Sequence, residues 1–223
     1  MLLLAVDTAT PAITAGVVAL DGGAARVLAE RVTVDAKAHG ELLTPHLLHA
    51  LNSAGRELSE VDAVVCGVGP GPFTGLRAGM VTAAALGHAL DVAVYPVCSL
   101  DAIAAEVPGA PLLVVTDARR REVYWAGYDG TGARVTGPAV ERPAELAARL
   151  PELGVHRAAG YGARLYAEVL GLAVTGPEHP SPAGLVAAAG PALRAGTPAG
   201  PLTPLYLRRP DAVEPGARKR VLR

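Results

Sequence analysis

The segment from Cys66 to Met80, CGVGPGPFTGLRAGM, constrains the fold more than any other part of the sequence. It joins an apolar run that predicts a strand to a run with helical periodicity. A glycine-rich turn between a strand and a helix can bind phosphate, because N–H groups at the start of the helix point at the anion. It can equally bring two backbone segments into close contact. The first question is which of these two roles the segment has.

The spacing of the glycines argues against a phosphate loop. The segment has no lysine followed by serine or threonine, which a G-x-x-x-x-G-K-[ST] loop requires. Nor do Gly67, Gly69 and Gly71 fit the G-x-G-x-x-G pattern. Pro70 and Pro72 lack the N–H donors that a phosphate needs. The motif alone therefore favours packing and leaves nucleotide binding as the alternative.

The helix expected after the turn, residues 74–90, carries small residues on one side. Gly75, Gly79, Ala83 and Gly87 recur every four residues, which aligns them in a stripe. A glycine inside a helix costs about 1 kcal/mol relative to alanine, so three of them indicate close approach of another backbone. The stripe packs either on the chain's own sheet or on a partner, and the spacing does not decide between the two.

The order of the expected elements repeats along the chain. Residues 2–34 predict a three-stranded meander, followed by a helix over 39–54 and a strand over 61–68. Residues 112–128 begin again with a strand, a turn led by aspartate and a returning strand. We expect an α/β protein with two related parts.

Composition excludes several classes of protein. The chain has 223 residues, 51% of them apolar, and 20 Lys and Arg balance 21 Asp and Glu, so no general affinity for nucleic acid or membranes is expected. Cys66 and Cys98 lie far apart in apolar surroundings, which predicts buried free thiols and no disulfide. The N-terminus lacks the basic region of a signal peptide, and no apolar run is long enough for a membrane span. We therefore expect a cytoplasmic protein.

Five stretches carry a family resemblance, in order along most of the chain. They are LAVDTAT at 4–10, HGELLTPHL at 39–47, GVGPGPFTGLRAGMVTAAALG at 67–87, DARRREVYWAGY at 117–128 and PLTPLYLRR at 201–209. In these stretches the chain closely resembles the bacterial tRNA threonylcarbamoyladenosine biosynthesis proteins called TsaB or YeaZ. It departs from that family at Pro72, where serine is more frequent, and residues 129–200 match only loosely.

The resemblance implies an actin-like fold of the ASKHA and ribonuclease H-like type, in which mixed sheets flanked by helices form two related subdomains. Residues 1–98 would form the first subdomain and residues 99–191 the second. Residues 192–209 would pack back on the first subdomain. Residues 210–223, which include three arginines and a lysine, are expected to be a mobile basic tail.

The resemblance also implies a function. TsaB proteins support the catalytic subunit TsaD, together with the ATPase TsaE, in making N6-threonylcarbamoyladenosine at position 37 of tRNAs that read ANN codons. By this likeness the chain is an accessory, non-catalytic dimerisation subunit. It would carry no cofactor itself, and ATP and metal are expected in the partner subunits.

A partner interface is expected on the helices over residues 39–54 and 74–90, with a homodimer as the alternative when the chain is alone. Glutamate at both Leu47 and Met80 is expected to abolish pairing while leaving the chain folded. The apolar side chains predicted at this interface are Leu43, Leu47, Leu51, Phe73, Leu76 and Met80.

Two further groups of residues leave alternatives open. Asp7 and Thr8 are either a vestige of the nucleotide site of actin-like ATPases or part of a capped tight turn. Arg119, Arg120 and Arg121 either contact tRNA phosphates or form a solvated turn.

No catalytic or metal site is expected. TsaD binds its metal through two histidines of an H-x-x-x-H helix, and the equivalent stretch here, residues 98–104, has no histidine. His46 and His49 share a helix face without an evident third ligand. Cys98 and Ser99 have no histidine nearby in the sequence, which leaves only a triad assembled in space.

Two rival functions set different requirements. A stand-alone actin-like ATPase or kinase requires Asp7 and the glycine-rich segment to bind Mg-ATP. A metal-dependent peptidase requires a complete set of metal ligands.

Overall fold

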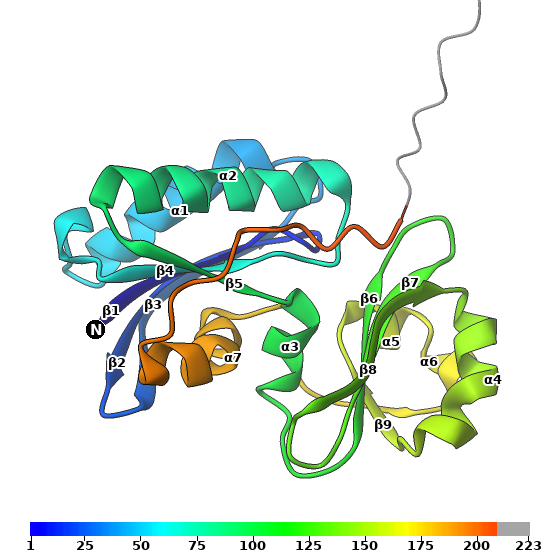
Figure 1. Ribbon diagram of the computed structural model, residues 1–223. Coiled ribbons are helices and arrows are strands. Elements are labelled where there is room, and N and C mark those ends of the chain that lie inside the picture. Colours follow the sequence, from blue (N-terminus) through cyan, green and yellow to red (C-terminus); the bar gives the residue numbers. More distant parts are fainter. Residues whose placement is uncertain (209–223) are drawn as a thin grey trace, which may run out of the picture.

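The computed structural model describes residues 1–208 and contains two five-stranded mixed sheets with helices around them (Figure 1). The predicted tail from residue 210 lies outside the described residues. The strands of the first sheet are β1 (Leu2–Asp7), β2 (Ala12–Asp21), β3 (Ala24–Val34), β4 (Ala63–Gly67) and β5 (Ala93–Val97). Those of the second are β6 (Leu112–Asp117), β7 (Val123–Tyr128), β8 (Arg134–Glu141), β9 (Arg157–Ala159) and β10 (Ala173–Val174).

The two sheets have the same topology. In the first the order is β3-β2-β1-β4-β5, with β1, β2 and β3 antiparallel and β4 and β5 parallel to β1. In the second β6 takes the place of β1, and the order β8-β7-β6-β9-β10 repeats the same directions. The central strands β1 and β6 are continuously apolar because both of their faces are covered. The prediction of two related halves is confirmed.

Helices cover both faces of the first sheet (Figure 1). α1 (His39–Ser53) and α2 (Phe73–Leu90) pack on one face, and α7 (Pro182–Ala195) packs on the other. The remaining helices are η1 (Leu58–Glu60), α3 (Ser99–Ala104), α4 (Pro143–Leu153), α5 (Tyr161–Leu165) and α6 (Ala167–Leu170). None of the helices in the described part of the chain is long and apolar enough to cross a membrane.

The position of α7 corrects the boundary expected at residue 191. α7 follows the second sheet in the sequence, but its apolar side packs against β1 and β2 of the first sheet. Conversely, α3 follows the first sheet and packs in the core of the second. Each helix is therefore exchanged onto the other half, and they cross where Gly184 leaves room for the Ala102 carbonyl.

Residues 197–208, here called the C-terminal strap, connect the two halves (Figure 1). Leu205 donates its N–H to the Val68 carbonyl at 2.9 Å and packs against the apolar cores of both halves. Arg208 donates to the Ala118 carbonyl at 3.0 Å and pairs with Glu122 at 3.3 Å. The end of the described chain is thus held on the turn between β6 and β7.

The glycine stripe of α2 packs on the chain's own backbone. The Thr8 hydroxyl donates to the Gly75 carbonyl at 2.7 Å and accepts from the Gly79 N–H at 2.9 Å. A Cβ at Gly79 would lie 2.4 Å from that hydroxyl, and one at Gly71 would lie 2.2 Å from the Ala9 carbonyl oxygen. At Gly87 a Cβ would lie 2.3 Å from Val94. Close approach of the β1–β2 turn and of β5 therefore requires these glycines.

Alanine at Gly79 is expected to destabilise the chain by about 1–3 kcal/mol, because its Cβ would displace the Thr8 hydroxyl from α2. Gly40 in α1 is the matched control, since a Cβ there meets nothing within 4 Å. Gly40→Ala should raise stability by about 0.4–1 kcal/mol. Chemical denaturation of both variants measures the difference, and equal unfolding free energies would contradict the packing described here.

Candidate functional site

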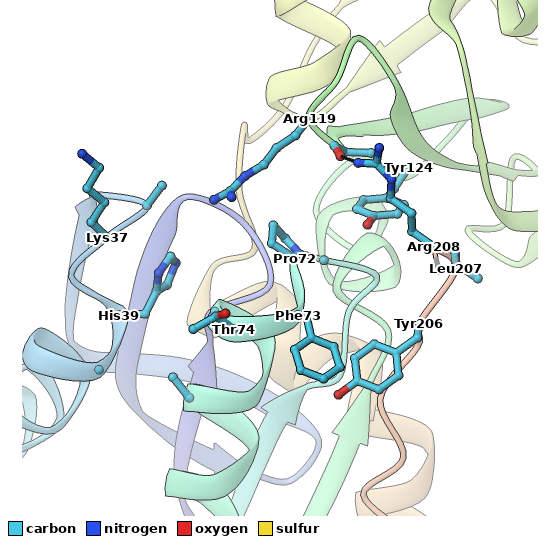
Figure 2. Close-up of a pocket in the computed structure, with 16 residues that line it drawn as sticks. Lys37, His39, Pro72, Phe73, Thr74, Arg119, Tyr124, Tyr206, Leu207 and Arg208 are labelled. Carbon is cyan, nitrogen blue, oxygen red and sulfur yellow. Dashed lines mark hydrogen bonds between the residues drawn. The ribbon is translucent and has the colours of Figure 1, made fainter. Parts of the chain in front are cut away.

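A cleft of about 930 Å³ opens where the two halves meet (Figure 2). Its walls are the β3–α1 loop, the start of α2, the β6–β7 turn and the C-terminal strap. The charged or ionisable side chains that line it are basic, apart from the phenols of two tyrosines, and none of the lining residues is acidic. The basic residues are Lys37, His39, Arg119 and Arg208.

The turn between β6 and β7 has an unusual backbone. Arg119, Arg120 and Arg121, here called the arginine turn, have positive φ angles of 62°, 50° and 62°. A residue with a Cβ pays about 1–2 kcal/mol in this left-handed conformation. Asp117 stabilises the turn by accepting the Arg119 N–H at 3.0 Å, and Arg208 binds the carbonyl just before it. The turn holds Arg119 at the cleft, while all three arginines are exposed.

Two aromatic rings and an arginine form an exposed cluster at the start of α2. The rings of Phe73 and Tyr206 stack with centroids 5.0 Å apart, and both residues are about 40% exposed. The guanidinium of Arg77 lies 3.5 Å from the Phe73 ring centroid and donates to the Tyr206 hydroxyl at 2.8 Å. This cluster attaches the C-terminal strap to α2 beside the cleft.

Asp7 and Thr8 are closed off from solvent, and Thr8 bonds to Gly75, which lines the cleft. The Asp7 carboxyl accepts from the Ser99 hydroxyl at 2.5 Å and from the Ala9 N–H at 2.8 Å, and a Cβ at Gly67 would overlap it. Burial raises the pKa of Asp7 from 3.8 to about 6, although both hydrogen bonds oppose that shift. With the Thr8 hydroxyl bonded to α2, neither side chain offers a free polar atom to a nucleotide. The geometry corresponds to the tight-turn alternative.

The interface residues predicted from the sequence need a correction. Only Phe73 is exposed, and the other five side chains are buried in the core that α1 and α2 form with the first sheet. Glutamate at Leu47 or Met80 would therefore place a charge inside the chain's own core, and the expectation that such a variant stays folded is abandoned. The five buried residues are Leu43, Leu47, Leu51, Leu76 and Met80.

The exposed side of α2 is apolar too, but its residues differ from the six predicted at the interface. Its residues recur at i, i+3, i+4, i+7 and i+8, and from Ala78 to Leu90 the only ionisable side chain is His88. Val81 is 67% exposed, and Leu48 on the neighbouring α1 is 55% exposed. The absence of charges from this stretch was the available signal, since an exposed helix face normally carries them. We call Val81, Ala84, Ala85, His88 and Ala89 the outer face of α2.

The candidate nucleophiles Cys66, Cys98 and Ser99 are all buried. Burial raises the pKa of Cys98 to about 11 and raises that of Cys66 further, so both thiols stay protonated near neutrality. Ser99 is fully buried, and its hydroxyl donates to Asp7 and accepts from the Gly69 N–H at 3.2 Å. Within residues 1–208 no histidine is hydrogen-bonded to Ser99, so no Ser-His pair is assembled there.

The two histidines of α1 contact β3 and do not form a metal site. His46 bonds the Thr33 hydroxyl at 2.8 Å, and His49 bonds the Arg31 guanidinium. Partial burial lowers the pKa of His46, with Arg31 as a second cause. Within residues 1–208, no group of three or more His, Cys, Asp and Glu side chains is placed to hold a metal ion.

The repeated sheet topology and the exchanged helices define a two-lobed protein of the actin-like, ribonuclease H-like class, as expected. Residues 26–175 match the model of a family described as TsaD: tRNA N6-adenosine threonylcarbamoyltransferase. The match spans more than half of the chain, which therefore belongs to this family, among its TsaB and YeaZ-type members.

Individual relatives agree with this placement. An uncharacterised protein of Mycobacterium tuberculosis is 56% identical over 210 residues, covering 94% of this chain and 93% of that protein. The tRNA threonylcarbamoyladenosine biosynthesis protein TsaB of Escherichia coli is 34% identical over 57% of this chain and 55% of its own length. The solved structure of YeaZ from Pseudomonas aeruginosa has a TM-score of 0.76 at 30% identity, covering 92% of this chain and 99% of that one.

The raised pKa of Asp7 predicts a pH-dependent stability that Asp7→Asn removes. The folded state binds the proton more tightly than the unfolded chain, so the free energy of unfolding falls as the pH rises from about 4 to about 6. A rise from 3.8 to about 6 corresponds to about 3 kcal/mol. Denaturation of wild type and Asp7→Asn across this range isolates the effect. Parallel profiles for the two proteins would show that Asp7 does not titrate there.

Proposed function

We propose that this protein is an accessory, non-catalytic subunit that pairs with a TsaD-like catalytic subunit in the cytoplasm. The complex would form N6-threonylcarbamoyladenosine at position 37 of ANN-reading tRNAs, with a TsaE-like ATPase as a further component. Family membership and the named TsaB relatives support this role. ATP and metal would be bound by the partner subunits.

The observation that carries the proposal is the outer face of α2. The inner side of the helix is filled by the chain's own core, so its solvent-facing side has no partner among residues 1–208. Three alanines and a valine give a smooth apolar strip on which another helix can pack closely. An apolar strip of this kind is typical of a protein interface. We expect it to bind the TsaD-like subunit, or a second copy of this chain when that subunit is missing.

The non-catalytic role is supported by what the equivalent positions contain. Residues 98–104, which correspond to the metal-binding helix of TsaD in the resemblance, contribute Cys98 and Ser99 and no histidine. Both side chains are buried in the joint between the two halves. The Asp7 carboxyl, which an ATPase of this fold would direct at Mg-ATP, is bonded to Ser99 instead. The rival functions of ATPase and peptidase therefore find little support.

Val81→Glu is expected to prevent heterodimer formation while leaving the chain folded, because the residue is exposed and lies on the outer face of α2. The matched control is Val135→Glu on β8, where the valine is 62% exposed on the other half. Size-exclusion chromatography with light scattering, with and without the TsaD-like protein, measures pairing, and circular dichroism checks the fold. Wild-type pairing of a folded Val81→Glu variant would refute the interface.

The isolated chain is expected to contain no stoichiometric zinc or iron and to hydrolyse no ATP. The reasons are the missing histidine pair and the closed position of Asp7. Elemental analysis of tag-free protein and a phosphate-release assay test the two parts. ATP turnover that disappears in Asp7→Ala, or a bound metal at unit stoichiometry, would favour a rival function.

A further inference from the structure

Two basic side chains of the cleft, Lys37 and Arg119, differ from Arg208, whose charge is balanced by Glu122. In the described chain, residues 1–208, neither the Arg119 guanidinium nor the Lys37 ammonium has a hydrogen-bond or ion-pair partner. Figure 2 shows Arg119 extending from the second half across the cleft, with Lys37, His39 and Thr74 on the opposite wall. With no acidic residue among the lining side chains, the cleft is suited to an anion that contacts both halves.

The choice of arginine at all three positions of the turn indicates that these side chains have a function in binding. Three successive left-handed residues would be least costly as glycine or asparagine. The chain instead has arginines there, and their guanidinium forks match the oxygens of a phosphate group. Arg121 is exposed like Arg119, so the basic surface continues outside the cleft. A ligand that carries several phosphates in a row fits this arrangement better than a single anion does.

The wall of the cleft opposite the arginine turn adds two features that suit a nucleic acid. α2 begins at Phe73 without a side-chain cap and with no acidic residue in its first turn, so its first N–H groups favour an anion. The stacked Phe73 and Tyr206 rings line the same cleft and remain partly exposed. Exposed rings beside a basic groove bind unpaired bases by stacking.

We propose that the cleft and the arginine turn bind the backbone phosphates of an unpaired stretch of RNA, with the ring of Tyr206, which Phe73 supports from behind, stacking against a base. Lys37 and Arg119 would contact a phosphate from the two walls, and Arg121 would contact a neighbouring one. This inference rests on the proposed function, since the RNA would be the substrate of the complex. It gives this chain its own part in holding that substrate.

The test is a titration of unmodified tRNA transcript at several salt concentrations between about 50 and 200 mM. It is run on the full chain alone and with the TsaD-like protein. In Lys37→Gln/Arg119→Gln, the loss of two phosphate contacts on a single strand should lower the magnitude of the log–log salt slope by about 1.4 and weaken binding about tenfold or more. The control is Arg26→Gln/Arg56→Gln, which removes the same charge from two exposed arginines that do not line the cleft.

A second pair of variants separates charge from shape. Ala36 is exposed and lines the cleft, so Ala36→Glu adds a carboxylate at its mouth without disturbing the core. We expect Ala36→Glu to weaken binding of the transcript several-fold, while Ala36→Gln, of the same size but neutral, binds like wild type. Circular dichroism confirms that all variants are folded.

The outcomes are distinguishable. If wild type does not pair with the TsaD-like protein, the proposed function fails, and the titration on the chain alone still tests RNA binding. An unchanged salt slope in folded Lys37→Gln/Arg119→Gln overturns the inference. The inference is also overturned if this variant loses heterodimer formation but binds RNA like wild type. That result would identify the cleft as a docking site for an acidic segment of the partner protein.

Discussion

The packing of α2 in the first half of the molecule depends on the Thr8 hydroxyl, which forms hydrogen bonds with two backbone groups of that helix. It requires glycine at positions 75 and 79, because a Cβ would occupy the place of the β1–β2 turn. Asp7 stabilises the β1–β2 turn by accepting the Ala9 N–H, and its carboxyl also accepts the hydroxyl of Ser99 at the start of α3. A single buried network therefore positions α2 against its own sheet and ties it to the helix that leads into the second half.

This arrangement separates the two sides of α2. The inner side, with the glycine stripe and the buried leucine and methionine, is used entirely by the fold. The outer face remains apolar and exposed, so it is the side available to a partner. A helix that is apolar all round is stable in a soluble protein only when both sides are covered. The fold covers one side, and we attribute the other to the subunit interface.

The cleft depends on the repetition of the fold. Two sheets of identical topology exchange α3 and α7, and the C-terminal strap joins them through Leu205 and Arg208. The exchange brings the β6–β7 turn, with Arg119, opposite the β3–α1 loop, with Lys37. Asp7 and Thr8 are buried in this joint, whereas Lys37 and Arg119 are exposed and line the cleft.

The sequence by itself determined the strands within residues 2–34, 61–68 and 112–128, the repeat, the glycine stripe and the family, because each depends on local pattern or on motifs contiguous in the chain. It gave no signal for β8 and β10. Only the tertiary structure decided which side of α2 is buried, since a helix apolar on all sides gives its residues no preferred direction. It also decided that α7 returns to the first sheet and that Lys37 faces Arg119. These pairs are far apart in the sequence, and their meeting depends on the packing of whole elements, which no local pattern records.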